Sequence, residues 1–510
     1  MQLHWQFMNY SSIIPITNRI PANRQGAKRH YGIHPYFTRR PFNVVRDYIL
    51  HYSDRGDTVI DPFGGSGVTA IEAFLENRIG VQNDINPLAN FIASGIVELT
   101  KVAVDDILDN LIIMEKECKE ELTKIHQSNG SRIDINKYNV DLPANVKLPS
   151  NSDVESYFDL FTPQQLISLA ILKKHIGKID NHSIRQVFLL AWSSTLARIN
   201  KTFISTRGRV ETRGGSSIFS IYRYKVAKDV VELNPWECFY NRFHNILKAK
   251  KEMMASIEIK QKKEKWEGQF KVYKLDVDEL RDLYYESADY VFTDPPYGGH
   301  ISYIDLSILW NSWLGLMPND EMRQKEIIVG GELKFTEEHY IKRLRDSIKS
   351  CFDMLKDGRW LSIVFQHWNV EYFEAILSAA QESNAELKAA VSQIGDPIWS
   401  MHKKKGKESV LAGEFILTFY KKVGIKGVKE GRKIDVKGLI GKILQDYKKK
   451  TIYGEYLLNQ LVIEAWKYGI IKELRIKKED LIDLLNEHGW VYDSKNHCWC
   501  KSNKPHDYLF

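Results

Sequence analysis

The sequence predicts an α/β protein in which a mostly parallel sheet is interrupted by a helical insertion and followed by a small C-terminal α+β domain. Three observations predict this class. Short apolar strand patterns alternate with helical patterns on both sides of a long helical stretch, one strand leads into a glycine-rich turn, and another leads into two adjacent prolines. With 510 residues, the chain exceeds what one hydrophobic core usually organises, so more than one domain is expected.

The first alternating stretch runs from Arg40 to Asn90. A helical pattern is followed by an apolar strand, a glycine turn, a second helical pattern and a second strand, at residues 41–53, 56–61, 64–67, 68–77 and 78–84. Strand, turn, helix and strand in this order are typical of a βαβ unit, which predicts that the two strands are parallel.

Long helical patterns dominate residues 96–264 before strand patterns return. The later strands are expected at residues 269–277, 288–297, 358–366, 385–393 and 414–422. We therefore expect one sheet domain split between residues 1–95 and 265–423, with a mostly helical insertion at 96–264. A basic linker follows, and residues 424–510 are expected to form a small, winged-helix-like α+β domain.

Composition narrows the class of protein further. Hydrophobic residues make up 43% and charged residues 27%, which is ordinary for a folded protein, and no apolar run approaches the ~18 residues of a membrane span. The N-terminus shows no secretory signal pattern. Five scattered cysteines argue against a disulfide framework and suit a reducing cytosol, so a cytoplasmic location is expected. The net charge of +7 permits a polyanionic partner.

The glycine turn reads Asp61-Pro62-Phe63-Gly64-Gly65-Ser66-Gly67 and opens a helix. Glycines in such a turn let backbone amides approach a ligand, and Asp84, at the end of the next strand, can accept hydrogen bonds from ribose hydroxyls. Alone, the segment fits a nicotinamide or flavin site as well as a site for S-adenosylmethionine, and a turn that binds nothing is a third interpretation.

The proline pair in Asp294-Pro295-Pro296-Tyr297 distinguishes between these interpretations. Prolines lack an N–H and push the preceding residue into extended geometry, so the strand ends in a stiff turn. That turn offers two neighbouring acceptors, the Asp294 carboxylate and the Pro295 carbonyl, beside an aromatic face. Two acceptors suit an exocyclic amine with two N–H donors, and they would stabilise the positive charge that develops when the amine attacks an electrophile.

Together, these motifs resemble the amino-methylating DNA methyltransferases, which transfer a methyl group from S-adenosylmethionine to an exocyclic base nitrogen. The resemblance covers about residues 28–90 and 270–422 and implies a Rossmann-like, seven-stranded methyltransferase sheet with an antiparallel strand at 414–422. It implies S-adenosylmethionine as the cofactor and double-stranded DNA as the partner, so that in a bacterial host the protein would be associated with the nucleoid. It does not imply a metal ion. The residues that match the catalytic motif are Asp294, Pro295, Pro296 and Tyr297; those that match the cofactor-binding motifs are His34, Thr38, Asp61, Phe63, Gly64, Gly65, Gly67, Asp84 and Asp276.

Several alternatives stay open at this point. The Asp-Pro-Pro-Tyr form favours N6 of adenine in this family, with N4 of cytosine as the alternative, and a cognate restriction nuclease is a possible partner. Transfer-RNA guanine-N2 methyltransferases use a similar turn, a nicotinamide or flavin oxidoreductase shares the glycine loop, and a degenerate methylase fold could bind DNA without turnover. The oligomeric state is not predicted.

The expected DNA contacts lie in a Gly-containing loop of the insertion. Arg207, Arg209 and Arg213 could read guanine edges or hold phosphates. An ordinary solvated surface loop is the equally weighted alternative. The short motif His497-Cys498-x-Cys500 lacks a second half with ligand spacing, so a hairpin without a metal is expected there.

Overall fold

The computed structural model describes residues 8–23, 28–128, 135–205, 214–262, 265–299, 301–367, 369–393, 414–424, 435–475 and 478–501. Its centre is a seven-stranded sheet with the strand order β5-β2-β1-β6-β7-β9-β8. The strands are β1 (Thr58–Asp61), β2 (Ile79–Asn83), β5 (Gln269–Tyr273), β6 (Ala288–Thr293), β7 (Leu355–Gln366), β8 (Ala385–Ser392) and β9 (Glu414–Lys421).

The strands from β5 to β7 pair in parallel, whereas β9 runs antiparallel between β7 and β8. Each predicted strand segment forms one of these strands, so the predicted α/β class with a Rossmann-like, mostly parallel seven-stranded sheet is confirmed. Ile60 of β1 pairs with Val81 of β2 and with Val291 of β6. This register brings the carboxyl ends of the three strands to one edge of the sheet.

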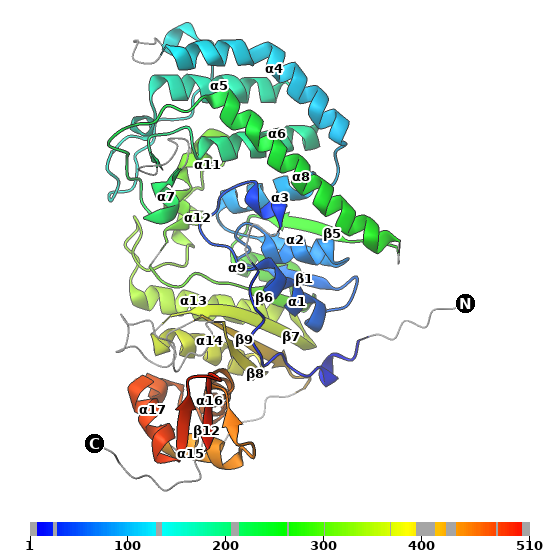
Figure 1. Ribbon diagram of the computed structural model, residues 1–510, viewed down its shortest axis with the longest axis vertical. Coiled ribbons are helices and arrows are strands. Elements are labelled where there is room, and N and C mark those ends of the chain that lie inside the picture. The colour runs from blue at the N-terminus through cyan, green and yellow to red at the C-terminus, as the bar shows by residue number, and fades with distance from the viewer. Residues whose placement is uncertain are drawn as a thin grey trace.

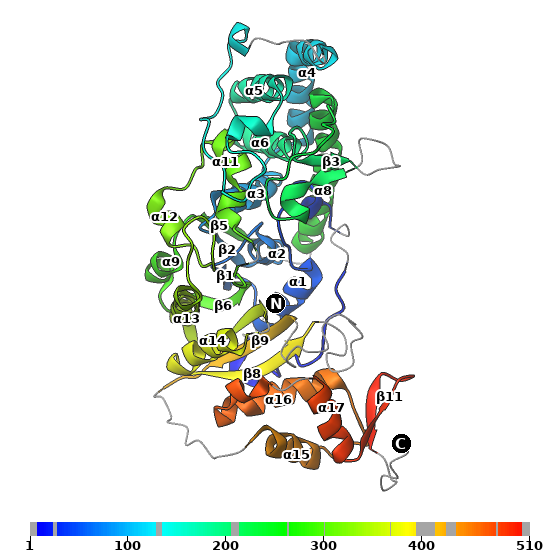
Figure 2. The ribbon, with the colours of Figure 1, turned by 90° about the vertical axis from the view of Figure 1, so that its left-hand side faces the viewer.

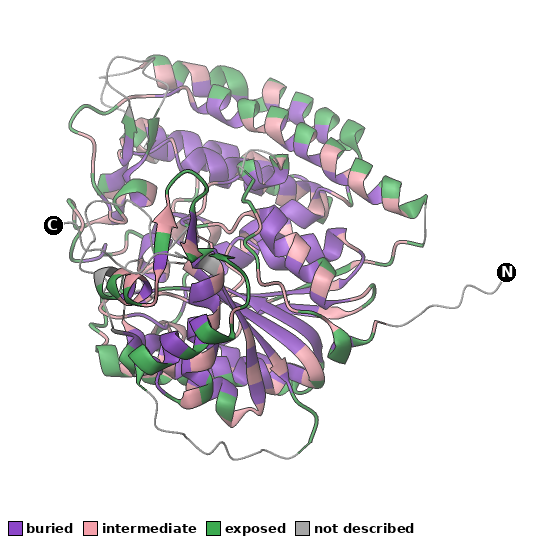
Figure 3. Ribbon diagram, turned by 60° about the horizontal axis from the view of Figure 1, so that its bottom comes forward, coloured by how far each residue is buried: buried purple, intermediate pink, exposed green. Residues whose placement is uncertain are grey.

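Helices cover both faces of the sheet. One face packs against α1 (Phe42–Tyr52), α2 (Val68–Leu75) and α3 (Pro87–Glu98), and the other against α9 (Val277–Tyr284), α13 (Glu337–Met354) and α14 (Val370–Glu382). Successive strand residues point to opposite faces, so that Val59 belongs to the first hydrophobic cluster and Ile60 to the second. Apart from the edge strand β5, whose residues are exposed or half-buried, the strands are accordingly buried along most of their length (Figure 3).

The predicted insertion contains the helices α4 (Val104–Gln127), α5 (Pro163–Gly177), α6 (His182–Leu196), α7 (Ser217–Ser220) and α8 (Pro235–Gln261), with a two-stranded sheet of β3 (Phe203–Ser205) and β4 (Gly214–Ser216). These helices lie at one end of the molecule (Figure 1). The predicted boundary between residues 95 and 96 falls inside α3. Because α3 packs directly against α6, the buried residues of the insertion continue those of the first sheet face.

The C-terminal elements lie at the opposite end of the long axis (Figures 1 and 2). They are α15 (Val436–Asp446), β10 (Thr451–Ile452), α16 (Gly454–Tyr468), α17 (Lys478–Glu487), β11 (Trp490–Asp493) and β12 (Cys498–Lys501), with an antiparallel sheet in the order β10-β12-β11. Helix α16 packs on β8, where Asn459 Oδ1 accepts a hydrogen bond from Ala390 N at 2.6 Å. The division of the chain into three domains remains a proposal.

Short elements complete the fold. They are η1 (Tyr10–Ser12), η3 (Arg29–Gly32), η4 (Ile135–Lys137), η5 (Tyr157–Leu160), α10 (Tyr303–Leu306), α11 (Ile308–Leu314), α12 (Asp320–Gln324) and η6 (Ile471–Arg475). Over the described ranges, none of the helices is long and apolar enough to cross a membrane.

Candidate active site

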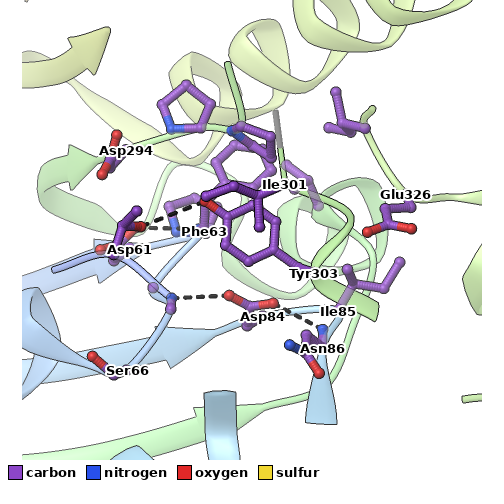
Figure 4. A pocket seen from close by; sticks show the side chains of 18 of the residues that line it. Asp61, Phe63, Ser66, Asp84, Ile85, Asn86, Asp294, Ile301, Tyr303 and Glu326 are labelled. Atoms are coloured by element: carbon purple, nitrogen blue, oxygen red, sulfur yellow. Dashed lines mark hydrogen bonds between the residues drawn. The ribbon is translucent and has the colours of Figure 1, made fainter. Parts of the chain in front are cut away.

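A cavity opens at the carboxyl ends of β1, β2 and β6, the edge at which open α/β sheets bind ligands. An acidic residue stands at each of these strand ends, and Figure 4 shows Asp61, Asp84 and Asp294 around the cavity. Most residues predicted from the sequence line it. They are Thr38, Asp61, Phe63, Gly64, Gly65, Asp84, Asp276, Asp294, Pro295, Pro296 and Tyr297.

The glycine turn is held against the end of β2. Gly65 has a positive φ of 50°, and its N–H donates to Asp84 Oδ2 at 2.9 Å. A Cβ at Gly65 would lie 3.2 Å from the Tyr36 ring, and one at Gly64 would overlap the Gln82 side chain. Glycine at both positions therefore lets the turn pack closely against Gln82 and Tyr36, and both glycines line the cavity.

Asp84 faces the cavity with a fixed carboxylate. Besides Gly65 N, it accepts a hydrogen bond from Asn86 N, which lies 2.8 Å from Asp84 Oδ1 (Figure 4). Enclosure by the protein raises its pKa to about 6, although both backbone donors favour the ionised form. A carboxylate in this position can accept further hydrogen bonds from a ligand with hydroxyl groups.

Asp61 connects the ends of β1 and β6. Its Oδ1 accepts hydrogen bonds from Thr293 Oγ1 at 2.7 Å and from Phe63 N at 3.1 Å, and burial raises its pKa to about 7. Thr293 directly precedes Asp294, so these bonds fix the glycine turn relative to the proline turn.

The acceptors of the proline turn differ in the hydrogen bonds that they already accept. The Asp294 carboxylate accepts a hydrogen bond from Arg40 Nε at 2.5 Å and a second from the Tyr297 hydroxyl. The Pro296 carbonyl accepts from Tyr340 at 2.6 Å, whereas among the hydrogen bonds of the described residues none involves the Pro295 carbonyl. Pro295 itself is one of the residues that line the cavity.

Two predicted cofactor-binding residues do not line the cavity. His34 is buried; its Nε2 lies 2.8 Å from Ser193 Oγ, and burial lowers its pKa to about 3, so it packs the insertion against the upstream segment. Gly67 starts α2 with a φ of 90°, and a Cβ there would lie 2.6 Å from Ala93 Cβ. Glycine at this position therefore allows the start of α2 to pack closely against α3.

The predicted DNA-contacting residues, Arg207, Arg209 and Arg213, lie outside the described residues. At the C-terminal hairpin, the Sγ atoms of Cys498 and Cys500 are 3.9 Å apart, and Asp493 completes a group of three potential metal ligands. The Asp493 carboxylate already accepts hydrogen bonds from the turn that follows it. The prediction of a hairpin without a metal therefore stays a prediction.

Some cavity residues were missed by sequence reasoning. Arg39 and Arg40 directly follow Thr38, and the doublet of arginines was a signal that could have singled them out. Arg39 donates to Ser66 Oγ at 2.7 Å and so connects the segment around Thr38 to the glycine turn. Tyr303 and Glu326 come from segments without a recognisable motif; burial raises the pKa of Glu326 to about 8.

Two comparisons with known proteins found similarity over part of the chain. The family model for N6 and N4 methyltransferases, described as DNA methylase, matches residues 6–93, which include His34, Thr38, the glycine turn and Asp84. The Type II methyltransferase M.MjaII of Methanocaldococcus jannaschii is 32% identical over 101 residues. That alignment covers 19% of this chain and 18% of the relative, so it spans less than one fifth of that protein's length.

Proposed function

We propose that this chain, a member of the amino-methyltransferase family, transfers a methyl group from S-adenosylmethionine to the exocyclic N6 of an adenine in DNA. Membership of the family is supported by the DNA methylase match and by the similarity to a type II methyltransferase. The observation that carries the proposal is that one cavity is bounded both by the glycine turn with Asp84 and by the Asp294-Pro295 turn. A cofactor and an amine could therefore meet within it.

The residues of the cavity fit the cofactor. Gly64 and Gly65 of the turn line the cavity, and Asp84 offers a carboxylate for ribose hydroxyls. We assign Asp84 and Asp276 to the nucleoside end, and Thr38 with the glycine turn to the methionine end. S-adenosylmethionine supplies the electrophilic methyl group on its sulfonium.

The proline turn would hold the nucleophile. An exocyclic amine conjugated with its ring is a poor nucleophile, because its lone pair is delocalised. The Pro295 carbonyl and the Asp294 carboxylate can each accept a hydrogen bond from one N–H group of the amine. Both then stabilise the positive charge that forms on the nitrogen during attack. The Tyr297 ring, which packs edge-on against Phe365 at 5.4 Å, offers an aromatic surface beside them.

An adenine paired in a duplex cannot reach this cavity, so we propose that the target base is flipped out of the helix. The helical insertion and the C-terminal unit, which comprises the elements from α15 to β12, flank the sheet at opposite ends. Both are candidates for DNA recognition. Arg207, Arg209 and Arg213 remain our expected contacts, and a cognate restriction nuclease remains a proposed partner.

Single-molecule sequencing of DNA from a methylation-free host that expresses the chain tests the proposal. N6-methyladenine at one recurring motif is the expected result and would also identify the recognition sequence. N4-methylcytosine at one motif would keep the mechanism and change the target base. Unmodified DNA from cells that contain the folded protein would contradict the proposal and direct the search to RNA.

A further inference from the structure

Arg40 is the centre of a charged cluster behind the proline turn. Its Nε donates to Asp294 Oδ2 at 2.5 Å, its Nη2 donates to the Tyr297 hydroxyl at 2.6 Å, and its Nη1 pairs with Glu414. The Tyr297 hydroxyl in turn donates to Asp294. Glu414 is the first residue of β9 and lies 374 residues from Arg40 in the sequence, outside every motif of the cavity.

The cluster is largely enclosed by protein. The exposed fractions of the side chains are 16% for Arg40, 21% for Asp294 and 23% for Glu414. Solvent therefore screens these charges less than it would at an open surface. Burial and the neighbouring Asp294 raise the pKa of Tyr297 well above its usual value, so its hydroxyl stays neutral. One guanidinium and two carboxylates leave the cluster with a net charge of −1.

This charge balance matters for attack by an amine. The nitrogen gains positive charge as the new bond forms, and a carboxylate nearby stabilises it. Arg40 opposes that effect, since its guanidinium lies directly on the Asp294 carboxylate. With Arg40 and Asp294 alone, the two charges would largely cancel at the amine. The second carboxylate restores a net negative charge while Arg40 continues to orient both Asp294 and Tyr297.

We propose that Glu414 is a positioning residue for methyl transfer, which offsets the charge of Arg40 so that Asp294 can stabilise the developing positive charge on the amine. The inference rests on the proposed function and extends it to a residue on the antiparallel strand. Glu414 is not among the residues that line the cavity. It acts through Arg40 and does not touch the substrate.

Glu414→Gln tests the inference, because the amide keeps the shape and an oxygen acceptor for Arg40 but removes the charge. Under saturating DNA and S-adenosylmethionine, kcat is expected to fall by about tenfold to a hundredfold, a smaller effect than direct removal of a transition-state contact. The dissociation constant for S-adenosylmethionine and the KM for DNA are expected to stay within about twofold. Glu414→Asp keeps the charge and is expected to retain most of the wild-type kcat.

The matched control is Glu386→Gln on the neighbouring strand β8, where the carboxylate pairs with Lys388 and Lys422. It makes the same chemical change away from the cavity and is expected to leave kcat unchanged. Glu414→Ala serves as a second uncharged variant if the Gln variant does not fold, with the same loss expected.

Two results would overturn the inference. The first is an uncharged variant with wild-type kcat. The second is a variant whose cofactor affinity falls as much as its kcat, since that pattern indicates a purely structural role. Failure of the proposed function looks different, because the wild-type protein itself would then leave DNA unmodified.

Discussion

At the residue scale, the environment of Asp84 makes its charge sensitive to pH close to neutrality. Burial raises its pKa to about 6, so the folded protein binds a proton there more readily than a free aspartate would. As the pH falls through about 6, the carboxylate becomes protonated and turns from a charged acceptor into a neutral group. A ligand that donates hydrogen bonds to it loses affinity in the same range.

We therefore expect the affinity for S-adenosylhomocysteine, a stable probe of the site, to weaken as the pH is lowered from 7.5 to 5.5. Asp84→Asn is expected to lower affinity at pH 7.5 by about tenfold or more, the effect of one charged hydrogen bond, and to flatten the pH dependence. Isothermal titration calorimetry measures both. Asp61 and Glu326 also titrate near this range. If the affinity of the Asn variant changes with pH as steeply as that of the wild type, Asp61 or Glu326 causes the pH dependence.

Asp294→Ala is expected to lower methyl transfer by at least about a thousandfold, because it removes an acceptor aimed at the developing charge. Cofactor binding is expected to stay within about threefold, since Asp294 makes none of the contacts that hold the glycine turn or Asp84. Incorporation of labelled methyl groups into DNA measures the first effect and calorimetry the second. Near-normal methylation by this variant would refute the assignment of the proline turn.

Residue-level prediction from sequence rests on features whose effect on the backbone is local. Two prolines after an acidic residue, or glycines between a strand and a helix, restrict the backbone whatever surrounds them. The contact between Arg40 and Glu414 is of the other kind: only the fold brings these two side chains together. The placement of His34 is of the same kind, because its burial against Ser193 depends on where the insertion packs.

At the scale of elements, the junction of α2 and α3 depends on Gly67. Its φ of 90° and the 2.6 Å that would separate a Cβ at this position from Ala93 Cβ both penalise a side chain. Sequence reasoning assigned this glycine to the cofactor, because the same residue type serves close ligand approach and close helix packing. A substitution would lower cofactor affinity if Gly67 served ligand approach, and would lower stability if it served helix packing.

Gly67→Ala is expected to lower the free energy of unfolding by about 2–4 kcal/mol, from backbone strain together with a steric clash. Gly56→Ala is the matched control, since Gly56 has a φ of 78° but a Cβ added there would have no atom within 4 Å. In this variant only the backbone strain should lower the free energy of unfolding, by about 1–2 kcal/mol. Urea denaturation measures the difference. Equal losses for both variants, or a loss of cofactor affinity at unchanged stability, would contradict the packing role.

At the scale of the whole molecule, the buried apolar residues in the described part of the chain form two large clusters, one on each face of the sheet. The first continues into the helical insertion and the second into the C-terminal unit, where Leu457, Leu461 and Trp490 join residues of α13 and α14. The strand and helix patterns predicted the elements of this unit. They could not predict its packing on β8, because apolar residues reveal that a face is buried but not what buries it.

This continuity predicts that the sheet and the C-terminal unit unfold together. Asn459 tests it, because its buried side chain accepts a hydrogen bond from Ala390 N of β8. Asn459→Leu leaves that amide without an acceptor, at a cost of about 1–3 kcal/mol, and should lower the midpoint of a single calorimetric transition. Gln445→Leu, an exposed position on α15 of the same unit, serves as a comparison and should shift the midpoint less. Two separate transitions, with only the smaller one displaced by Asn459→Leu, would show that the C-terminal unit is an independent folding domain.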